Sequence, residues 1–197
     1  MQNCCMPNLY IIAGCNGAGK TTASYTVLPE MLNCKEFVNA DEIARGLSPF
    51  QPDKAAIDAG KIMLTRIKEL IKQQVDFSFE TTLSARHFVS LINTAQQQGY
   101  FVTLVFFWLN STDLAIQRVK MRVSEGGHNI PHDTIKRRYK MGVTNLIKLY
   151  IPVCDYWMVI NNSVSPFQLI AEGLQNREIE IKEEVIWNQI KDYAHEK

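Results

Sequence analysis

A short apolar run followed by a glycine-punctuated loop limits most strictly what this chain can fold into. Residues 9–13 read LYIIA and residues 14–21 read GCNGAGKT, which fits the pattern G-x-x-x-x-G-K-[ST]. The apolar run predicts a buried β-strand, and the loop stands between this strand and the start of a helix. Gly14, Gly17 and Gly19 allow backbone conformations closed to other residues, so successive N–H groups can point inward. The stretch therefore predicts a phosphate-binding loop.

Three features of this loop predict that it holds the phosphates of ATP. Lys20 supplies a cation that can bridge the β- and γ-phosphates, and the hydroxyl of Thr21 can bind Mg²⁺. The following helix adds the partial positive charge of its N-terminus. The alternative is a tight strand-to-helix turn in which the lysine has no role. We predict ATP and Mg²⁺ as cofactors, with nucleotide contacts from Gly14, Asn16, Gly17, Ala18, Gly19, Lys20, Thr21 and Thr22.

The composition suits one globular domain that spans residues 1–197. Of the 197 residues, 46% are hydrophobic and 21% are charged, which allows a sizeable core. The net charge of +1 gives no overall reason to expect nucleic acid as a partner. No run approaches the roughly 18 apolar residues that a membrane span needs, so we expect a cytoplasmic protein without a membrane partner. The cysteines lack metal-ligand spacing and are expected to be reduced thiols: Cys4, Cys5, Cys15, Cys34 and Cys154.

Strand and helix patterns alternate along the chain. One helix is expected from Pro52 to about Gln74, and another over residues 87–99, closed by Gly99. The next strand, YFVTLVFFWL, is apolar on both faces, as expected in a parallel sheet that helices cover on each side. This pattern predicts a three-layer α/β/α fold of the P-loop kinase type, with a mostly parallel sheet and a helical lid.

The boundaries of these elements follow from the same patterns. The expected strands are residues 9–13, 36–39, 76–80, 101–109 and 156–160, with weaker candidates at 168–172 and 178–182. The helical spacing after Pro52 predicts one face that consists of Gly60, Leu64, Ile67 and Ile71.

The most apolar strand ends in Asn110 and not in a carboxylate. Many P-loop ATPases carry an Asp at that place to hold Mg²⁺, whereas a small-molecule kinase needs a carboxylate that orients the acceptor hydroxyl. Asp41 is the candidate, because it follows the strand at 36–39 and the carboxyl ends of parallel strands share one sheet edge. The alternative role for Asp41 is the N-cap of the helix that begins there.

A second group of polar residues closes the next strand in the segment FSFETT. Glu80, Thr81 and Thr82 fall on the same expected edge of the sheet as Asp41. Such side chains can bind the hydroxyls of an acceptor or a water molecule of the Mg²⁺ shell. The alternative is a capping cluster for the helix that follows.

Two basic helices separated by the break EGGHNIP predict a lid over residues 111–140. Arg118 and Arg122 lie four residues apart on one helix face, and the second helix carries the sequence IKRRYK. Arginine suits a lid because its planar fork can spread over phosphate oxygens. The alternatives are solvated helix faces with surface ion pairs, or a nucleic-acid surface, which interspersed acidic residues disfavour. The predicted catalytic residues are Lys20, Asp41, Arg118, Arg122, Arg137 and Arg138.

Four motifs in order resemble the zeta toxin family of P-loop kinases, in particular its chromosomal branch. They are GCNGAGKTT, VNADEIARGLSP, FSFETTLS and RVKMRVSEGGHNIPHDTIKRRY. The resemblance runs from about Leu9 to Asn162. Zeta toxins are ATP-dependent kinases that phosphorylate the sugar 3'-hydroxyl of UDP-N-acetylglucosamine, and a small helical antitoxin neutralises them. The resemblance therefore implies a small-molecule acceptor and allows for a small helical antitoxin as partner.

The resemblance also implies roles for individual residues. Asp41 would be the general base, while Lys20 and Thr21 would hold ATP and Mg²⁺. Arg118 and one arginine beyond the hinge, at position 137 or 138, would stabilise the transferring phosphoryl group. We expect substrate contacts from Asp41, Arg45, Glu80 and Thr82.

The chain departs from the family pattern at Ser84, where the well-studied toxins carry an arginine two residues after the Thr. The lost arginine changes which anion or ring the acceptor site can hold. His128 in the break either contacts substrate or caps the broken helix. Residues 166–197 look like a small β-hairpin and a terminal helix. Alternative functions are an ATP-binding regulatory protein with weak ATPase activity and a nucleic-acid kinase.

Overall fold

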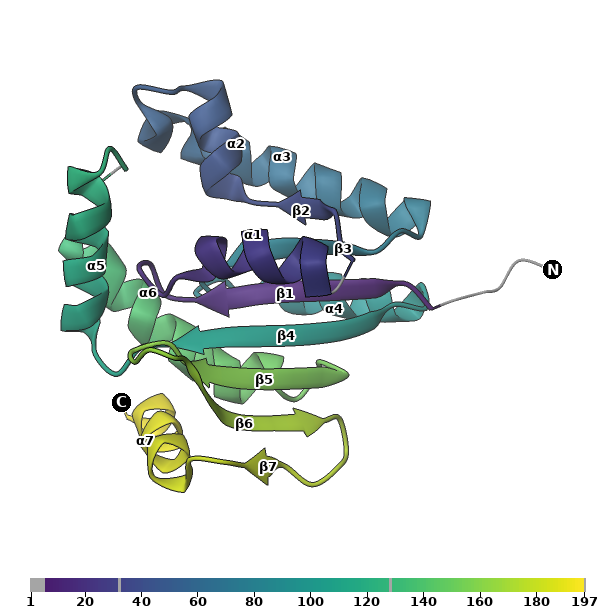
Figure 1. The fold of residues 1–197 in the computed structure, drawn as a ribbon. Coiled ribbons are helices and arrows are strands. Elements are labelled where there is room, and N and C mark those ends of the chain that lie inside the picture. The colour runs from purple at the N-terminus through teal and green to yellow at the C-terminus, as the bar shows by residue number, and fades with distance from the viewer. Residues whose placement is uncertain (1–5, 32, 128, 197) are drawn as a thin grey trace.

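The computed structural model describes residues 6–31, 33–127 and 129–196, so Cys4, Cys5 and His128 lie outside the described residues (Figure 1). A seven-stranded sheet with the order β2-β3-β1-β4-β5-β6-β7 forms its centre. Strands β1 to β5 are parallel, and β6 and β7 pair antiparallel with their neighbours. The strands are β1 Asn8–Gly14, β2 Glu36–Val38, β3 Phe77–Thr81, β4 Phe101–Trp108, β5 Tyr156–Asn161, β6 Gln168–Leu174 and β7 Glu180–Ile181.

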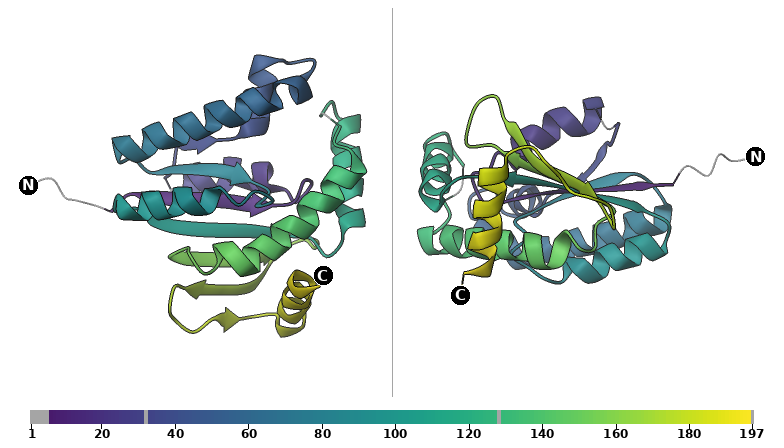
Figure 2. Two further views of the ribbon diagram at one scale, coloured as in Figure 1. Left: turned by 180° about the vertical axis from the view of Figure 1, so that it is seen from behind. Right: turned by 90° about the horizontal axis from the view of Figure 1, so that it is seen from below.

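Helices cover the sheet on both faces, which confirms the predicted three-layer α/β/α fold. Helix α1 lies on one face, against β1 and β3, whereas α4 and α6 lie on the other, against β4 and β1 (Figures 1 and 2). The helices are α1 Lys20–Met31, α2 Ala40–Leu47, α3 Pro52–Gln73, α4 Phe88–Gln97, α5 Thr112–Ser124, α6 His132–Asn145, the π-helical turn η1 Leu146–Tyr150 and α7 Glu184–His195.

The order of the strands determines where a ligand can bind. From β1 the chain crosses to β2 at the edge, returns to β3 beside β1, and then continues on the other side at β4. The loops after β1, β2 and β3 therefore meet at the carboxyl edge next to a point where the direction of winding reverses. Open α/β sheets bind their ligands at such a point.

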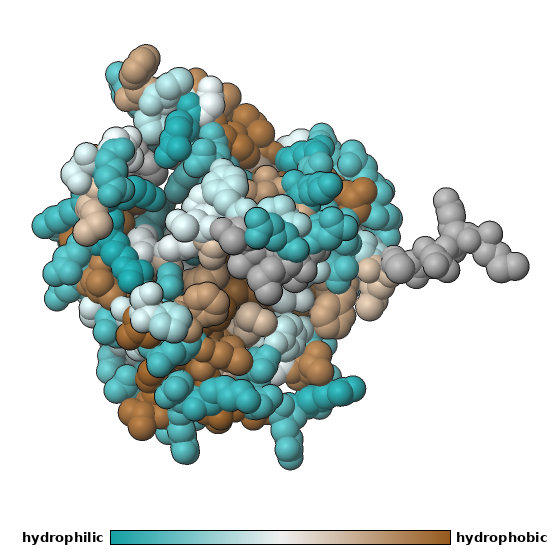
Figure 3. Space-filling model, in the orientation of Figure 1, coloured by the Kyte–Doolittle hydropathy of each residue, from teal (hydrophilic) through white to brown (hydrophobic). Residues whose placement is uncertain are grey.

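Strand β4 is buried along most of its length, as its apolar faces predict. On the face that carries α1, however, β4 and β5 are open to view in Figure 1, and apolar residues lie over this part in the space-filling view (Figure 3). Val105 of β4 and Met158 of β5, a register pair, are accordingly only half-buried. Among the described residues, no helix combines the length and the apolarity needed to cross a membrane.

The helix predicted to start at Pro52 is α3, but its buried face is shifted from the predicted one. Ile67 and Ile71 are buried as expected, whereas Gly60 and Leu64 are half-buried. The stripe moves because α3 packs against α2 and β2 at the edge of the sheet, while Gly60 and Leu64 line a cavity. The other buried positions are Ala59, Met63 and Leu70.

The predicted C-terminal hairpin extends the central sheet, because β6 pairs with β5 on one side and with β7 on the other. Helix α7 then packs against α6 and β6. Trp187 of α7 stacks on Trp157 of β5, with ring centroids 5.4 Å apart and ring planes 15° from parallel. Gly173 of β6 allows this, since an added Cβ would lie 2.9 Å from the Trp157 ring.

The stack predicts that Trp187→Ala lowers the free energy of unfolding by about 3–5 kcal/mol, the usual cost of truncating a buried aromatic side chain. Trp187 is 4% exposed, so its removal leaves a cavity beside Trp157. Urea denaturation followed by circular dichroism measures the change. Val185→Ala on the same helix, at a side chain that is 72% exposed, is the control and should have little effect. Equal losses in the two variants would contradict the packing of α7 on the sheet.

Candidate active site

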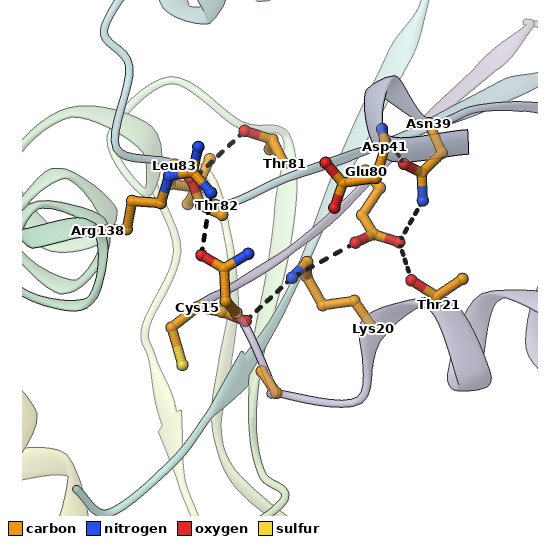
Figure 4. Close-up of polar contacts among 12 residues, drawn as sticks. Cys15, Lys20, Thr21, Asn39, Asp41, Glu80, Thr81, Thr82, Leu83 and Arg138 are labelled. Atoms are coloured by element: carbon orange, nitrogen blue, oxygen red, sulfur yellow. Dashed lines mark hydrogen bonds and ion pairs between the residues drawn. The ribbon is translucent and has the colours of Figure 1, made fainter. Parts of the chain in front are cut away.

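The candidate site lies at the carboxyl edge of β1, β2 and β3. It combines the loop after β1, the junction of β2 and α2, and the segment after β3 (Figure 4). Register pairing places Ala13 of β1 beside Thr81 of β3, so the phosphate loop and the segment with Glu80 begin side by side. The polar residues predicted from three separate motifs therefore meet in one place.

The loop after β1 has the backbone that its glycines predict. Gly17 and Gly19 have φ angles of +81° and +80°, which side chains other than glycine rarely adopt. A Cβ at Gly17 would lie 2.7 Å from the carbonyl oxygen of Ala115 in α5, and one at Gly19 would lie 2.6 Å from Nδ2 of Asn162. The loop is thus held closely between α5 and the segment after β5.

Lys20 and Glu80 form the buried ionic centre of the site. The Nζ atom of Lys20 lies 3.4 Å from Oε1 of Glu80 and donates a hydrogen bond of 3.0 Å to the carbonyl oxygen of Cys15. The side chains of Lys20 and Glu80 are 6% and 9% exposed. Burial would penalise either charge alone, so each depends on the other for stability.

Glu80 also accepts two hydrogen bonds at its other oxygen. The Thr21 hydroxyl donates to Oε2 at 2.7 Å, and Nδ2 of Asn39 donates to the same atom at 2.9 Å. Asn39 is a residue that the sequence interpretation missed. Its position directly before a helix, in the segment VNADE, is a signal typical of an N-cap.

Asn39, and not Asp41, caps helix α2. Its Oδ1 accepts hydrogen bonds from the backbone N–H groups of Asp41 at 2.8 Å and of Glu42 at 3.4 Å. The side chain of Asp41 is therefore free of the capping role that was its alternative. It is exposed, lies beside Glu80 in Figure 4 and lines the same cavity.

A cavity of about 260 Å³ connects the phosphate loop with the segment after β3. Asp41 and Glu80 provide carboxylates, and Thr82 and Ser84 share a hydrogen bond of 2.9 Å between their hydroxyls. Helix α3 supplies a wall with apolar residues. The complete lining is Asn16, Lys20, Asn39, Ala40, Asp41, Gly60, Met63, Leu64, Glu80, Thr81, Thr82, Ser84, Ala85, His87, Phe88 and Arg138.

The predicted arginines take different positions. Arg138 lines the cavity, and its Nη1 donates to Oδ1 of the buried Asn16 at 3.2 Å. Arg118 lies on α5 beside the phosphate loop. A Cβ added to Gly17 of that loop would be 3.2 Å from the Cβ of Arg118. Nε and Nη2 of Arg122 are buried without a hydrogen-bond partner among the described residues. Arg137 is exposed on the neighbouring position of α6.

Several other predicted contacts do not line this cavity. Arg45 is half exposed and pairs with Glu42 of its own helix, with Nη1 and Oε1 3.2 Å apart. Thr22 is exposed in the first turn of α1, whereas Ala18 of the phosphate loop is fully buried. Asn162 is another residue that the sequence interpretation missed, and its Nδ2 donates to the carbonyl oxygen of Ala18 at 2.8 Å.

The residues present suit Mg²⁺ held jointly with phosphates. Among the described residues, no group of three or more His, Cys, Asp or Glu side chains could hold a metal alone. Mg²⁺ takes few protein ligands and shares oxygen atoms of the substrate, and the Thr21 hydroxyl and the Glu80 carboxylate provide such oxygens. Burial raises the pKa of the neighbouring Cys15 thiol to about 11, so this thiol stays protonated at neutral pH and is a poor nucleophile.

Comparison with known proteins identifies the family. A family model described as zeta toxin matches residues 2–152, which include every predicted site residue. The chain belongs to the zeta toxin family. An uncharacterised protein of Haemophilus influenzae strain Rd is 34% identical over 127 residues, which are 64% of this chain and 88% of that protein.

Solved structures share the fold of this zeta toxin family member at low sequence identity. The AvrRxo1-ORF1:AvrRxo1-ORF2 complex with sulphate ions matches at a TM-score of 0.78 and 15% identity, over 95% of this chain and 64% of that chain. The same complex has also been solved with ATP. The PezAT chromosomal toxin–antitoxin system of Streptococcus pneumoniae matches at a TM-score of 0.65 and 16% identity, over 98% of this chain and 88% of that chain. These matches confirm the P-loop kinase type of fold.

The ionic centre predicts that Glu80→Gln lowers the free energy of unfolding by about 3 kcal/mol, because the buried Lys20 ammonium loses its opposite charge. Urea denaturation measures this loss. Pyrophosphate should raise the melting temperature of the variant more than that of the wild type, since an anion beside Lys20 replaces the missing charge.

Glu36→Gln is the control for this experiment. Glu36 pairs with Arg66 at the surface, where solvent screens the interaction, so its effect on stability should be far smaller. A Glu80→Gln protein as stable as the Glu36→Gln protein, with no added response to pyrophosphate, would refute the ionic centre.

Proposed function

We propose that this protein is an ATP-dependent kinase that transfers the γ-phosphoryl group to a hydroxyl of a small molecule. The observation that carries the proposal is one cavity lined by Lys20 of the phosphate loop and by the carboxylates of Asp41 and Glu80. A kinase needs these groups together, because donor phosphates and acceptor hydroxyl must be held in line. Membership of the zeta toxin family supports the same reaction class.

The donor half of the proposed reaction is the phosphate loop. Its N–H groups and Lys20 would bind the β- and γ-phosphates of ATP, and Thr21 would contribute to binding Mg²⁺, which neutralises charge on the phosphates. The Glu80 carboxylate, which accepts a hydrogen bond from Thr21, would help to orient the water molecules of that ion. A solved structure of the AvrRxo1 complex with ATP supports ATP as the donor.

Asp41 is the proposed general base of the acceptor half. Its carboxylate would accept the proton of the acceptor hydroxyl while that oxygen attacks the γ-phosphorus and the bond to ADP breaks. Because Asn39 caps α2, the Asp41 side chain is available for this role. Glu80 is held by Lys20, Thr21 and Asn39, so it is better suited to orientation than to proton transfer.

Positive charge for the transferring group would come from the arginines of α5 and α6. We propose Arg138 as the principal one, because it lines the cavity and contacts Asn16 of the phosphate loop. Arg118 and Arg122 share a face of α5, which packs on the same loop. Movement of residues 111–140 as a lid would bring these side chains onto the phosphates and exclude water.

The acceptor is proposed to be a metabolite hydroxyl, with UDP-N-acetylglucosamine and other nucleotide sugars as the first candidates because of the family. Ser84 replaces an arginine of the family pattern, which favours an acceptor with a different anionic group. A small helical antitoxin is a proposed partner, since the PezAT neighbour is a toxin–antitoxin system. We further propose that the protein acts in the cytoplasm, where ATP and such metabolites are found.

Asp41→Asn should lower the rate of phosphoryl transfer by about 10²-fold or more, because the acceptor hydroxyl loses its general base. The measurement is phosphorylation of an extracted metabolite pool with labelled ATP, followed by isolation of the labelled product. Asp58→Asn, at a carboxylate that pairs with Lys61 on the surface, is the control and should be as active as the wild type.

Transfer that survives Asp41→Asn would exclude Asp41 as the base. Slow ATP turnover that no metabolite stimulates would favour an ATP-binding regulatory protein instead. Labelling of oligonucleotide 5'-hydroxyls would indicate a nucleic-acid kinase.

Adjacent arginines of α6 should differ sharply in their effect. Arg138→Ala should lower kcat by about 100-fold, the usual loss when one preorganised donor to a developing charge is removed. Arg137→Ala should leave kcat nearly unchanged, because this side chain is exposed. Steady-state kinetics with saturating ATP measures both. Equal losses would show that Arg137 also reaches the phosphates in the closed enzyme.

A further inference from the structure

The segment after β3 holds an unfavourable backbone conformation at the edge of the cavity. Leu83 has a φ angle of +54°, in the left-handed region that residues with a Cβ rarely adopt, and its side chain is fully buried. Its backbone N–H donates a hydrogen bond of 3.1 Å to the hydroxyl oxygen of Thr81. Such a conformation persists only where the surroundings determine it. Thr82 and Ser84, whose hydroxyls line the cavity, flank this residue directly.

Helix α6 and the turn η1 supply these surroundings through three successive contacts. Nδ2 of the buried Asn145 donates to the carbonyl oxygen of Leu83 at 2.7 Å, and the hydroxyl of Tyr150 donates to the carbonyl oxygen of Ala85. Gly142 lies so close that an added Cβ would be 2.6 Å from the carbonyl oxygen of Thr82. One continuous helical face thus contacts the backbone at residues 82, 83 and 85.

The π-helical turn makes this alignment possible. Residues Leu146–Tyr150 form η1, and the N–H of Ile151 bonds to the carbonyl oxygen of Leu146, five residues earlier. A wider turn needs an extra residue before a side chain returns to the same face. Asn145 and Tyr150 are five residues apart, so η1 lets both reach the same segment.

We propose that Asn145 and Tyr150 are positioning residues for the acceptor. Gly142 belongs to the same contact face, because only a residue without a Cβ can lie so close to the Thr82 carbonyl. The two positioning residues act by fixing the backbone of residues 82–85, and so the Thr82 and Ser84 hydroxyls, against the cavity. Arg138 of the same helix also donates a hydrogen bond to Asn16 of the phosphate loop. Helix α6 therefore fixes the position of residues 82–85 relative to the phosphate loop. The role in acceptor binding rests on the proposed kinase function, whereas the control of the segment does not.

Three variants test the proposal, each with a different change at the same contact face. Gly142→Ala adds a methyl group against the Thr82 carbonyl, although alanine by itself favours the helix. Asn145→Ala and Tyr150→Phe each remove one donor to the segment. Gly46→Ala is the matched control, because a Cβ there meets nothing within 4 Å.

Hydrogen exchange measured by mass spectrometry reads the segment directly and needs no substrate. In Asn145→Ala and Tyr150→Phe, the amides of residues 81–87 should exchange on the order of tenfold faster, the ratio expected when one buried hydrogen bond is lost. Gly142→Ala should also speed their exchange, because its methyl group displaces the Thr82 carbonyl. In all three variants, α6 and the phosphate loop should stay protected. The Gly46→Ala protein should match the wild type. Unchanged exchange in this segment would overturn the proposal, and so would equal acceleration throughout the protein.

Kinetics tests the functional part separately. With the acceptor found by the labelling experiment, each variant should raise the KM for the acceptor about tenfold, with the affinity for ATP unchanged. Equal losses for ATP and acceptor would mean a structural role only. If the wild type transfers no phosphoryl group, the kinase proposal fails, while faster exchange in the variants would still establish that α6 positions the segment.

Discussion

The buried pairing of Lys20 with Glu80 is the interaction on which the rest of the site depends. It joins the end of β3 to the phosphate loop after β1, and Glu80 also accepts hydrogen bonds from Thr21 and from Asn39, which caps α2. A buried charge without a partner is strongly destabilising, so these groups hold three loops at one edge of the sheet. The geometry of the donor half and of the acceptor half is therefore set together.

Helices on the far side of the cavity complete this arrangement. Helix α5 packs its backbone at Ala115 against Gly17, and α6 contacts both the phosphate loop, through Arg138, and the segment after β3, through Asn145. Helix α5 thus contacts the phosphate loop, which would bind ATP, and α6 contacts both this loop and the segment that would bind the acceptor. A movement of α6 as a whole would therefore affect the phosphate loop and the segment after β3 together.

Much of the fold could be predicted from local patterns. The apolar strands, the loop GCNGAGKT and Gly99 at the end of a helix each follow from short-range rules of backbone conformation and burial. The loop pattern also predicted Lys20, and the rule that the carboxyl ends of parallel strands share one edge predicted Asp41 and Glu80; all three line one cavity. Local patterns failed for the buried face of α3, since packing against α2 and β2 left Gly60 and Leu64 for the cavity.

The sequence by itself determined the phosphate loop, the succession of strands and helices along the chain, and the types of residue that follow the strands. Each of these features depends on residues within a few positions of one another. Only the tertiary structure decided that Glu80 pairs with Lys20 and accepts a hydrogen bond from Asn39, and that Arg138 rather than Arg137 lines the cavity. It alone showed that Asn145 and Asn162 support backbone carbonyls of distant segments. These contacts join residues 62 and 144 positions apart, and no local pattern specifies such pairs.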